Sequence, residues 1–357
     1  MRFIHCSDLH LDSKMEANLS ERQARERNAE ICATFQRMVS YARENGVRAV
    51  LMAGDLFDSR RVSAQTADFV LDRIRGAGEV DFLCLRGNHD GQKDPFEGLE
   101  LPDNLKTFSD FWTYHEYGDV TVAGMEPDGE NWNSFYSNLR LCPERTNIVM
   151  LHGQIATQPG EDMIALPLLR EKHIRYLALG HLHSYQKEKL DAEGEYCYSG
   201  CLEGRGFDEC GPKGFVLLNV ENGKVDSEFV PFAARTLHEV CVDITDLTTV
   251  SQIRRAMEAA AEEINQSSLV KFTLTGSYTL QTQKDLQLLK KSLEPLFWFV
   301  KVKDESSFRI EKETYEHDAS LKGEFIRLVM ASNAGEEEKA RIICCGIQAL
   351  SGEEIVL

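Results

Sequence analysis

Five short motifs rich in histidine and aspartate each follow an apolar run of the sequence. The most compact is Gly87-Asn88-His89-Asp90, which comes directly after the apolar run 82–85. An amide oxygen, an imidazole and a carboxylate in succession can hold a metal ion and transfer protons near neutral pH. A single histidine after a strand is usually only hydrogen-bonded, but five of the ten histidines lie in these motifs. We therefore expect the ends of several strands to meet.

The first third of the chain alternates patterns of strand and helix. Apolar runs predict buried strands at 2–7, 48–53 and 81–85, and helical periodicity predicts helices at 21–44 and 64–74. Strands that alternate with helices form a parallel sheet with the helices on its faces. Because the loops after parallel strands emerge at one edge of the sheet, the first three motifs are expected to converge there.

The rest of the first 235 residues predicts a second sheet. His152 follows one of its apolar runs, and Gly180-His181-Leu182-His183 follows the next. We therefore expect an α/β fold, with a two-sheet core flanked by helices, in a domain of residues 1–235. The strands of this second sheet are predicted at 119–125, 147–151, 175–179, 195–199, 214–220 and 225–232.

Residues 236–306 have the pattern of a small domain of their own. Their predicted order is strand, helix, strand, helix, strand, which is a βαβαβ unit. Residues 307–357 predict a tail of two helices that divide near Asn333-Ala334-Gly335. The apolar positions of this tail need a partner surface, either in this chain or in another. The elements of the small domain are predicted at 237–244, 250–264, 269–274, 281–293 and 297–302.

The composition excludes several classes of protein. No run of about 18 uncharged apolar residues occurs, and Met1-Arg2-Phe3 leads directly into a predicted strand. We therefore expect a soluble cytoplasmic protein that has no contact with membranes. The ten cysteines are scattered and form no Cys-x-x-Cys pair, so we expect reduced thiols within the core.

The net charge is −18, of which −12 falls in residues 1–235 and −6 in residues 236–357. Neither part is a basic lobe that could hold a nucleic-acid backbone unaided. Any affinity for DNA is therefore expected to depend on divalent ions, a locally basic groove or a partner subunit.

The motifs resemble those of the calcineurin-like metallophosphoesterase superfamily. The family pattern of Asp-x-His, Gly-Asp, Gly-Asn-His-Asp/Glu, His and Gly-His-x-His occurs in order over residues 8–183. The resemblance implies a metallophosphoesterase core with a binuclear centre that acts through a bridging hydroxide. Oxygen and imidazole ligands suit Mn²⁺, and Zn²⁺, Fe or other divalent ions are also compatible. By this resemblance one ion would be held by Asp8, His10, Asp55 and His183, and the other by Asp55, Asn88, His152 and His181.

The same resemblance gives catalytic roles to two further residues. His89 would contact the phosphate and help the leaving group depart, as a proton donor or as a stabiliser of developing charge. Asp58 would fix the tautomer of His89. An equal alternative is that Asp58 is only a helix N-cap or a turn residue. Asp12 and Asp90 are interpreted as solvated turn carboxylates.

The amino-acid sequences of four segments resemble those of the bacterial DNA repair exonuclease branch of this superfamily, which includes the SbcD-like and YhaO-like proteins. This resemblance implies that residues 236–306 form a capping domain that guides DNA to the metals. It also implies that the tail docks on an SbcC-like coiled-coil ATPase subunit, and it is compatible with a homodimer. The predicted function is therefore a metal-dependent phosphodiesterase, a DNA exonuclease or endonuclease of DNA repair. The segments are 5–13, 178–183, 198–203 and 211–214.

Two residues, Leu9 and Asp12, differ from the SbcD-like sequence pattern and are closer to the YhaO-like pattern. With the acidic charge, they leave two other functions open: a small-molecule or nucleotide phosphodiesterase or phosphatase, and a docking subunit with weak catalysis. Arg86, Arg205 and Lys213 are candidates for contacts with phosphate, or else plain solvated side chains.

Overall fold

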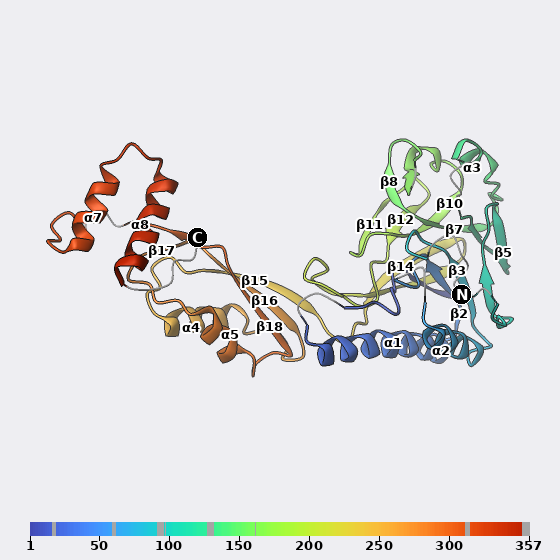
Figure 1. Ribbon diagram of the computed structural model, residues 1–357. Helices are drawn as coiled ribbons and strands as arrows, with labels where there is room; N and C mark the ends of the chain where they lie inside the picture. Colours follow the sequence, from blue (N-terminus) through green and yellow to red (C-terminus); the bar gives the residue numbers. More distant parts are fainter. Residues whose placement is uncertain are drawn as a thin grey trace. The chain divides into compact units, whose positions relative to one another are not determined.

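The chain divides into two compact units, Met1–Thr236 and Leu237–Leu357. Figure 1 shows the computed structural model of the protein, in which the elements of each unit can be followed along the chain. The structure describes residues 1–15, 19–58, 62–90, 96, 98–126, 132–160, 162–310 and 315–351.

The first unit contains two six-stranded sheets. In the first sheet, in the order β14-β13-β1-β2-β3-β4, strands β1 to β4 are parallel, and β13 and β14 add to one side as an antiparallel pair. The strands of this sheet are β1 (Arg2–Cys6), β2 (Val47–Ala53), β3 (Asp81–Leu85), β4 (Leu105–Thr107), β13 (Gly214–Glu221) and β14 (Lys224–Pro231).

The second sheet has the order β11-β12-β10-β7-β6-β5. Its four central strands are parallel, and its two edge strands are antiparallel to their neighbours. Its strands are β5 (Thr113–Tyr117), β6 (Val120–Gly124), β7 (Thr146–His152), β10 (Ile174–Gly180), β11 (Gln186–Lys189) and β12 (Glu195–Tyr198). Short elements beside it are α3 (Trp132–Asn138), β8 (Gln154–Ala156), β9 (Met163–Ala165) and the 3₁₀ helix η1 (Leu166–Leu168).

Successive side chains along each strand point to opposite faces of the sheet and so belong to two different cores. In β1, Phe3 belongs to the cluster between the two sheets, together with Met150 of β7 and Ala178 of β10. Its neighbour Ile4 belongs to the cluster on the outer face, where it is joined by Phe35 of helix α1. The predicted α/β fold with two sheets and outer helices is therefore confirmed. The prediction that 214–220 and 225–232 belong to the second sheet was wrong, because β13 pairs with β1 and so joins the first sheet together with β14.

The two long helices of the first unit, α1 (Glu21–Glu44) and α2 (Ala64–Arg75), begin at serine N-caps. Ser20 forms a capping box with Gln23, and the Ser63 side chain accepts a hydrogen bond from the Thr66 amide. Both helices cover the outer face of the first sheet through their buried stripes, in line with the predicted ranges. The helices therefore fix the sheet whose strand ends carry the first three motifs.

The second unit is built on three parallel strands, β15 (Leu237–Asp243), β16 (Leu269–Thr275) and β18 (Phe299–Asp304). Two helices pack on it through Ile253 and Leu289, against Phe272 of the sheet. A further cluster joins the last two helices through Ile326 and Ile343. The other elements of this unit are α4 (Val250–Ala260), β17 (Ser277–Tyr278), α5 (Leu286–Leu293), β19 (Ser307–Phe308), α7 (Leu321–Met330) and α8 (Glu336–Ser351).

Two properties expected from the composition can be compared with the structure. Among the described helices, none has the length and apolar character needed to cross a bilayer. All ten cysteines are free thiols, as expected. The expectation that they lie in the core holds for Cys6, Cys84, Cys197 and Cys201, whereas others, such as the exposed Cys142, lie outside it.

Candidate metal centre

The predicted motifs lie at the carboxyl ends of strands from both sheets of the first unit. Asp8 follows β1, Asp55 follows β2, and Asn88 follows β3 in the first sheet. In the second sheet, His152 is the last residue of β7, and His181 follows β10. The structure therefore brings the motifs together from segments that are up to 175 residues apart in the sequence, from Asp8 to His183.

The loops after β1 and β2 hold an unusual backbone conformation. Asp8, His10 and Asp55 have φ angles of 52°, 46° and 52°, in the left-handed region that side chains other than glycine rarely adopt. Hydrogen bonds between the loops maintain this conformation, since the Asp8 amide donates to Gly54 O at 3.0 Å and the His10 amide donates to Asp55 O at 3.1 Å. Strain of this kind costs about 1–3 kcal/mol per residue and is concentrated at functional sites.

Gly54 and Gly180 allow the strands that carry the site to approach closely. A Cβ atom on Gly54 would lie 2.1 Å from His152 Nδ1, and Gly54 also has a φ of +93°. A Cβ atom on Gly180 would lie 2.0 Å from Ala53 O. Neither distance can be accommodated, so the glycines of the Gly-Asp and Gly-His motifs are required for the approach of β2 to β7 and β10.

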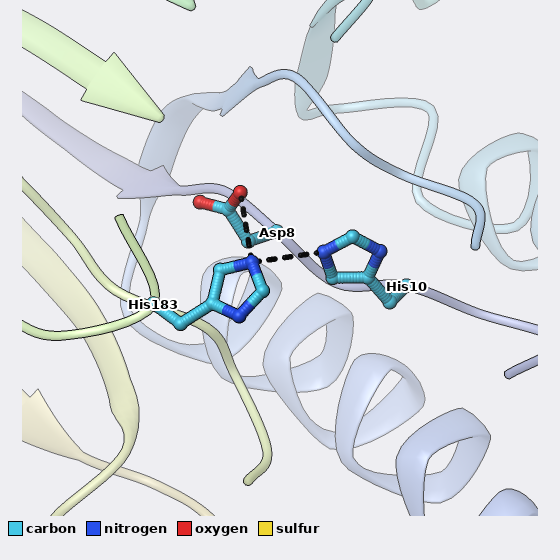
Figure 2. A group of neighbouring side chains, drawn as sticks. All are labelled: Asp8, His10 and His183. Carbon is cyan, nitrogen blue, oxygen red and sulfur yellow. Dashed lines mark hydrogen bonds and ion pairs between the residues drawn. The ribbon is translucent and has the colours of Figure 1, made fainter. Parts of the chain in front are cut away.

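Asp8, His10 and His183 form the first group of side chains (Figure 2). The Nε2 atoms of the two imidazoles face each other at 3.2 Å, and His183 Nε2 lies 3.7 Å from Asp8 Oδ1. Two imidazole nitrogens at this distance cannot both carry a proton. Neighbouring ligands of an octahedral ion are about 3 Å apart, so this spacing fits donors that share one metal.

Asn88, His152 and His181 form the second group, with Asp55 beside them. Asn88 Oδ1 lies 3.0 Å from His152 Nε2 and 3.4 Å from His181 Nδ1. Asp55 Oδ2 lies 3.4 Å from His152 Nε2 and 4.0 Å from His10 Nε2. One oxygen of Asp55 is therefore near both groups.

The donor set fits divalent metal ions. The carboxylates of Asp8 and Asp55 are almost fully buried, as are His10 and His152. Buried carboxylates are costly unless a cation compensates their charge. Oxygen and imidazole donors without a thiolate are the ligands of ions such as Mn²⁺ and Zn²⁺. The residues that could hold divalent ions therefore include the seven that the family resemblance implies: Asp8, His10, Asp55, Asn88, His152, His181 and His183.

Without a metal, the charged groups of the site stabilise one another. Burial alone would raise the pKa of Asp55, but the hydrogen bond and charge of His152 lower it. Burial would lower the pKa of His152, and its contacts with Asp55 raise it instead. The ionised form of Asp55 is therefore favoured, which is the form that binds a metal.

His89 lies at the rim of this site with an exposed side chain. Its amide donates to Asp55 Oδ1 at 2.8 Å, and its ring stands 5.1 Å from the ring of His10. Asp58 lies 3.1 Å from His10 Nδ1 and 2.6 Å from Arg205 Nη1. Ligand atoms of Asp58, His10 and His89 also lie within 4.8 Å of one another. Support of His89 by Asp58 stays a prediction, while contacts of Asp58 with His10 and Arg205 are present.

The two carboxylates interpreted as solvated have structural contacts. Asp90 is buried and accepts hydrogen bonds from the amides of Phe57 and Gly87, so the expectation of a solvated side chain was wrong. Asp12 accepts hydrogen bonds from the Ser63 amide and the Thr66 hydroxyl. Both side chains therefore connect loops around the site.

The three basic candidates for phosphate contacts are bound to protein groups. Arg86 Nη2 lies 2.5 Å from Glu126 Oε2, and Lys213 Nζ donates to the carbonyl of His183 at 2.6 Å. Arg205 pairs with Glu209 as well as with Asp58. Glu209, whose Oε1 lies 2.6 Å from His183 Nδ1, was not predicted from the sequence. Its only signal is its position in the loop after the Tyr-Ser-Gly segment, far from any strand end.

The chain is similar to several known proteins. The family model described as calcineurin-like phosphoesterase matches residues 1–185. The uncharacterized metallophosphoesterase YhaO of Bacillus subtilis (strain 168) is 26% identical over 300 residues, which cover 78% of this chain and 72% of that protein. The DNA double-strand break repair protein Mre11 of Sulfolobus acidocaldarius is 29% identical over 204 residues, which cover 54% of this chain and 52% of that protein. The alignment thus spans about half the length of that relative.

Among solved structures, a dimetal phosphatase from Danio rerio is 12% identical, with a TM-score of 0.42. The likeness covers 65% of this chain and 99% of that chain.

Proposed function

The chain belongs to the calcineurin-like phosphoesterase family, and from this premise we propose that it is a phosphodiesterase that cleaves DNA with two divalent metal ions. The position of Asp55 carries the proposal. Its Oδ2 atom lies within 4.0 Å of an imidazole nitrogen of each ligand group, His10 in one and His152 in the other. A carboxylate in this place is suited to bridge two ions, which are typically about 3.5–4 Å apart in such centres.

In the proposed centre, the ions would lower the pKa of a bound water and neutralise charge on the phosphate. Mn²⁺ is the proposed ion, because the donors are oxygen and imidazole only. His89 is exposed at the rim, where its imidazole can contact the phosphate and give a proton to the leaving oxygen. Asp58 lies within 4.8 Å of a ring nitrogen of His89, and we propose that it orients this imidazole.

DNA is the proposed substrate because of the relatives. Those named Mre11 are DNA double-strand break repair proteins, and several archaeal examples align over half or more of this chain. By the same comparison we propose a role in DNA repair. The second unit would then act in part as a cap, residues 236–306, that guides DNA, and in part as a docking tail, residues 307–357.

The proposed partner is a coiled-coil ATPase of the SbcC type, which would dock on the two last helices. Helix α7 exposes Leu321 and Leu328, with 72% and 64% of their surface accessible. Helix α8 exposes Ile342 and Leu350. Apolar side chains of this size on neighbouring helices favour a protein partner, and a homodimer is a further proposal for the same protein.

A small-molecule phosphodiesterase or phosphatase is the second candidate. The net charge of −18 favours it, because this charge repels the DNA backbone wherever no metal ion or basic partner compensates. A docking subunit with weak catalysis is less well supported, since all seven proposed ligands are present and in contact.

Parallel assays separate these functions. The purified protein with Mn²⁺ would be incubated with linear double-stranded DNA, single-stranded DNA and a chromogenic phosphodiester, with and without the ATPase. We expect cleavage of DNA, loss of all activity in Asp55→Asn, and a rate lower by about 10²–10⁴ in His89→Ala with its metal content unchanged. Hydrolysis of the small diester with both DNAs intact would exclude the nuclease.

A further inference from the structure

Two of the proposed ligand imidazoles have a carboxylate on the side away from the metal position. His183 directs Nε2 at Asp8 and places Nδ1 2.6 Å from Glu209 Oε1. His10 directs Nε2 at His183, and its Nδ1 atom lies 3.1 Å from Asp58 Oδ1, at ion-pair distance but without the geometry of a hydrogen bond. A carboxylate on the outer nitrogen fixes the tautomer of a histidine ligand and raises its basicity.

Arg205 joins these two carboxylates to each other. Its Nη1 atom lies 2.6 Å from Asp58 Oδ1, and its Nη2 atom lies 3.1 Å from Glu209 Oε1. Its own amide also donates to Glu209 Oε2 at 2.7 Å, so both oxygens of Glu209 are held. Lys213 adds a hydrogen bond to the carbonyl of His183. Both carboxylates are thereby fixed beside the imidazoles: Glu209 shares a hydrogen bond with His183, and Asp58 lies at ion-pair distance from His10.

The loop that carries Arg205 and Glu209 is anchored in the core. Glu203 is fully buried and lies 2.9 Å from Arg27 of helix α1, and it also accepts from the Thr34 hydroxyl at 2.7 Å. This loop follows β12 and therefore lies outside residues 1–185, the region that the family model matches.

The second ligand group has a different support. His152 Nδ1 lies 2.9 Å from the carbonyl oxygen of Ala53, which is a neutral acceptor. A neutral carbonyl increases the basicity of an imidazole less than a carboxylate does. Among the described residues, three imidazoles of the site thus have a neighbour on their outer nitrogen. The two charged neighbours, Glu209 and Asp58, both belong to the first ligand group, that of Asp8, His10 and His183.

We propose that Glu209 and Asp58, held in place by Arg205, make the position of Asp8, His10, Asp55 and His183 the tighter of the two metal sites. The protein then binds its two divalent ions in sequence, and this position fills first. Glu209 is a positioning residue, because it acts through His183 and does not itself contact the ion. This inference rests on the metal centre of the proposed function and adds an order of binding to it.

Calorimetric titration of the metal-free, full-length protein with Mn²⁺ tests the inference. We expect two binding steps in the wild type. In Glu209→Gln, the affinity of the tighter step should fall about 10–100-fold, and the affinity of the weaker step should not change. Electron paramagnetic resonance should show the same difference at one equivalent, as more free Mn²⁺ in Glu209→Gln than in the wild type. Asp81→Asn is the control, because this buried acid pairs with Lys106 at the opposite end of β3.

The outcomes are distinguishable. If Glu209→Gln binds two ions with the same affinities as the wild type, the inference is overturned and the metal centre remains in place. Equal weakening of both steps would also overturn it, because the effect would not belong to one position. A wild type that binds no Mn²⁺ would overturn the metal centre itself. Thermal unfolding of the metal-free variants shows whether Glu209→Gln remains folded, and Glu209→Asp, which keeps the charge, should restore part of the affinity.

Discussion

Gly54 lies between the last residue of β2 and the carboxylate that both ligand groups share. Its φ of +93° is unfavourable for other residues, and its α-carbon faces the ring of His152. Asp55 follows it with a left-handed backbone of its own. The residue therefore serves two purposes, since it turns the chain and leaves room for a ligand from the other sheet.

Substitution of this glycine should disable the site. Gly54→Ala is expected to lose Mn²⁺ binding and to reduce phosphodiesterase activity at least about 100-fold, because a 1 Å displacement at such a site has effects of this size. Gly46→Ala is the matched control: its φ is +63°, but a Cβ atom there would contact nothing within 4 Å. It should lower the free energy of unfolding by about 1–2 kcal/mol and leave activity unchanged. Equal activity in both variants would contradict this account of Gly54.

Site residues differ in how far the sequence reveals them. Asp8, Asp55 and His152 stand at strand ends, where periodicity and motif spacing already indicate convergence. Glu209 and Arg205 lie in an irregular loop, and their contacts depend on a tertiary arrangement that has no periodic signal. Groups that support ligands are therefore harder to predict than the ligands themselves.

Helix α1 is connected to the loop after β12 by the buried pair of Arg27 and Glu203, both almost fully inaccessible. Removal of one member of such a pair leaves an uncompensated buried charge. Arg27→Met should therefore lower the free energy of unfolding by about 3–5 kcal/mol, as measured by urea denaturation.

The double variant Arg27→Met/Glu203→Met is the control for this pair. It should recover most of the lost stability, because no charge is then left without a partner. A decrease below about 1 kcal/mol in Arg27→Met would show that the pair does not anchor the loop.

The two sheets of the first unit meet at another polar contact. His5 of β1 lies 2.9 Å from the hydroxyl of Tyr176 of β10, through its Nδ1 atom. Burial lowers the pKa of His5 to about 3, whereas the ordinary value is 6.5. Between these values the unfolded chain binds a proton that the folded protein does not bind.

Stability should therefore depend on pH through His5. Its contribution is complete above pH 6.5 and decreases by up to about 1.4 kcal/mol per pH unit as the pH falls toward 3. His5→Gln, which does not titrate, should show a smaller decrease between pH 6.5 and 5 in urea denaturation. Identical pH slopes for the wild type and His5→Gln would exclude this role of His5.

Edge strands mark the limit of prediction at the level of elements. The strand β11, with the sequence Gln-Lys-Glu-Lys at 186–189, is exposed at every position and has no apolar pattern. The strand β5 alternates between half-buried and exposed residues and has a buried side chain only at its last residue, Tyr117. Neither was predicted, whereas the buried central strands were, because burial on both faces gives the apolar runs that reveal a strand.

On the scale of the whole molecule, the charge of −18 must be reconciled with a proposed DNA substrate. Proteins that bind DNA alone do so chiefly through basic side chains. The chain instead offers a proposed metal centre in one unit and exposed apolar helices in the other. We therefore expect that DNA binding depends on divalent ions and on the partner subunit.

Contact with that partner can be disturbed without effect on catalysis. Leu328→Arg on α7 should weaken association with the coiled-coil ATPase at least about tenfold and leave hydrolysis of a small phosphodiester unchanged. Leu288→Arg on α5 is the matched control, since Leu288 is 52% exposed and lies outside the last two helices. Wild-type association of Leu328→Arg, measured by calorimetry, would show that this helix does not form the interface.

The central claim is that two metal ions, bridged by Asp55, are required for hydrolysis of phosphodiesters. Its most direct test is the rate of hydrolysis of a chromogenic phosphodiester as Mn²⁺ is added back to protein freed of metal by a chelator. We predict no activity without metal, recovery that saturates at two ions per chain, and neither activity nor the second ion in Asp55→Asn. Full activity in the metal-free protein, or in Asp55→Asn, would contradict the account.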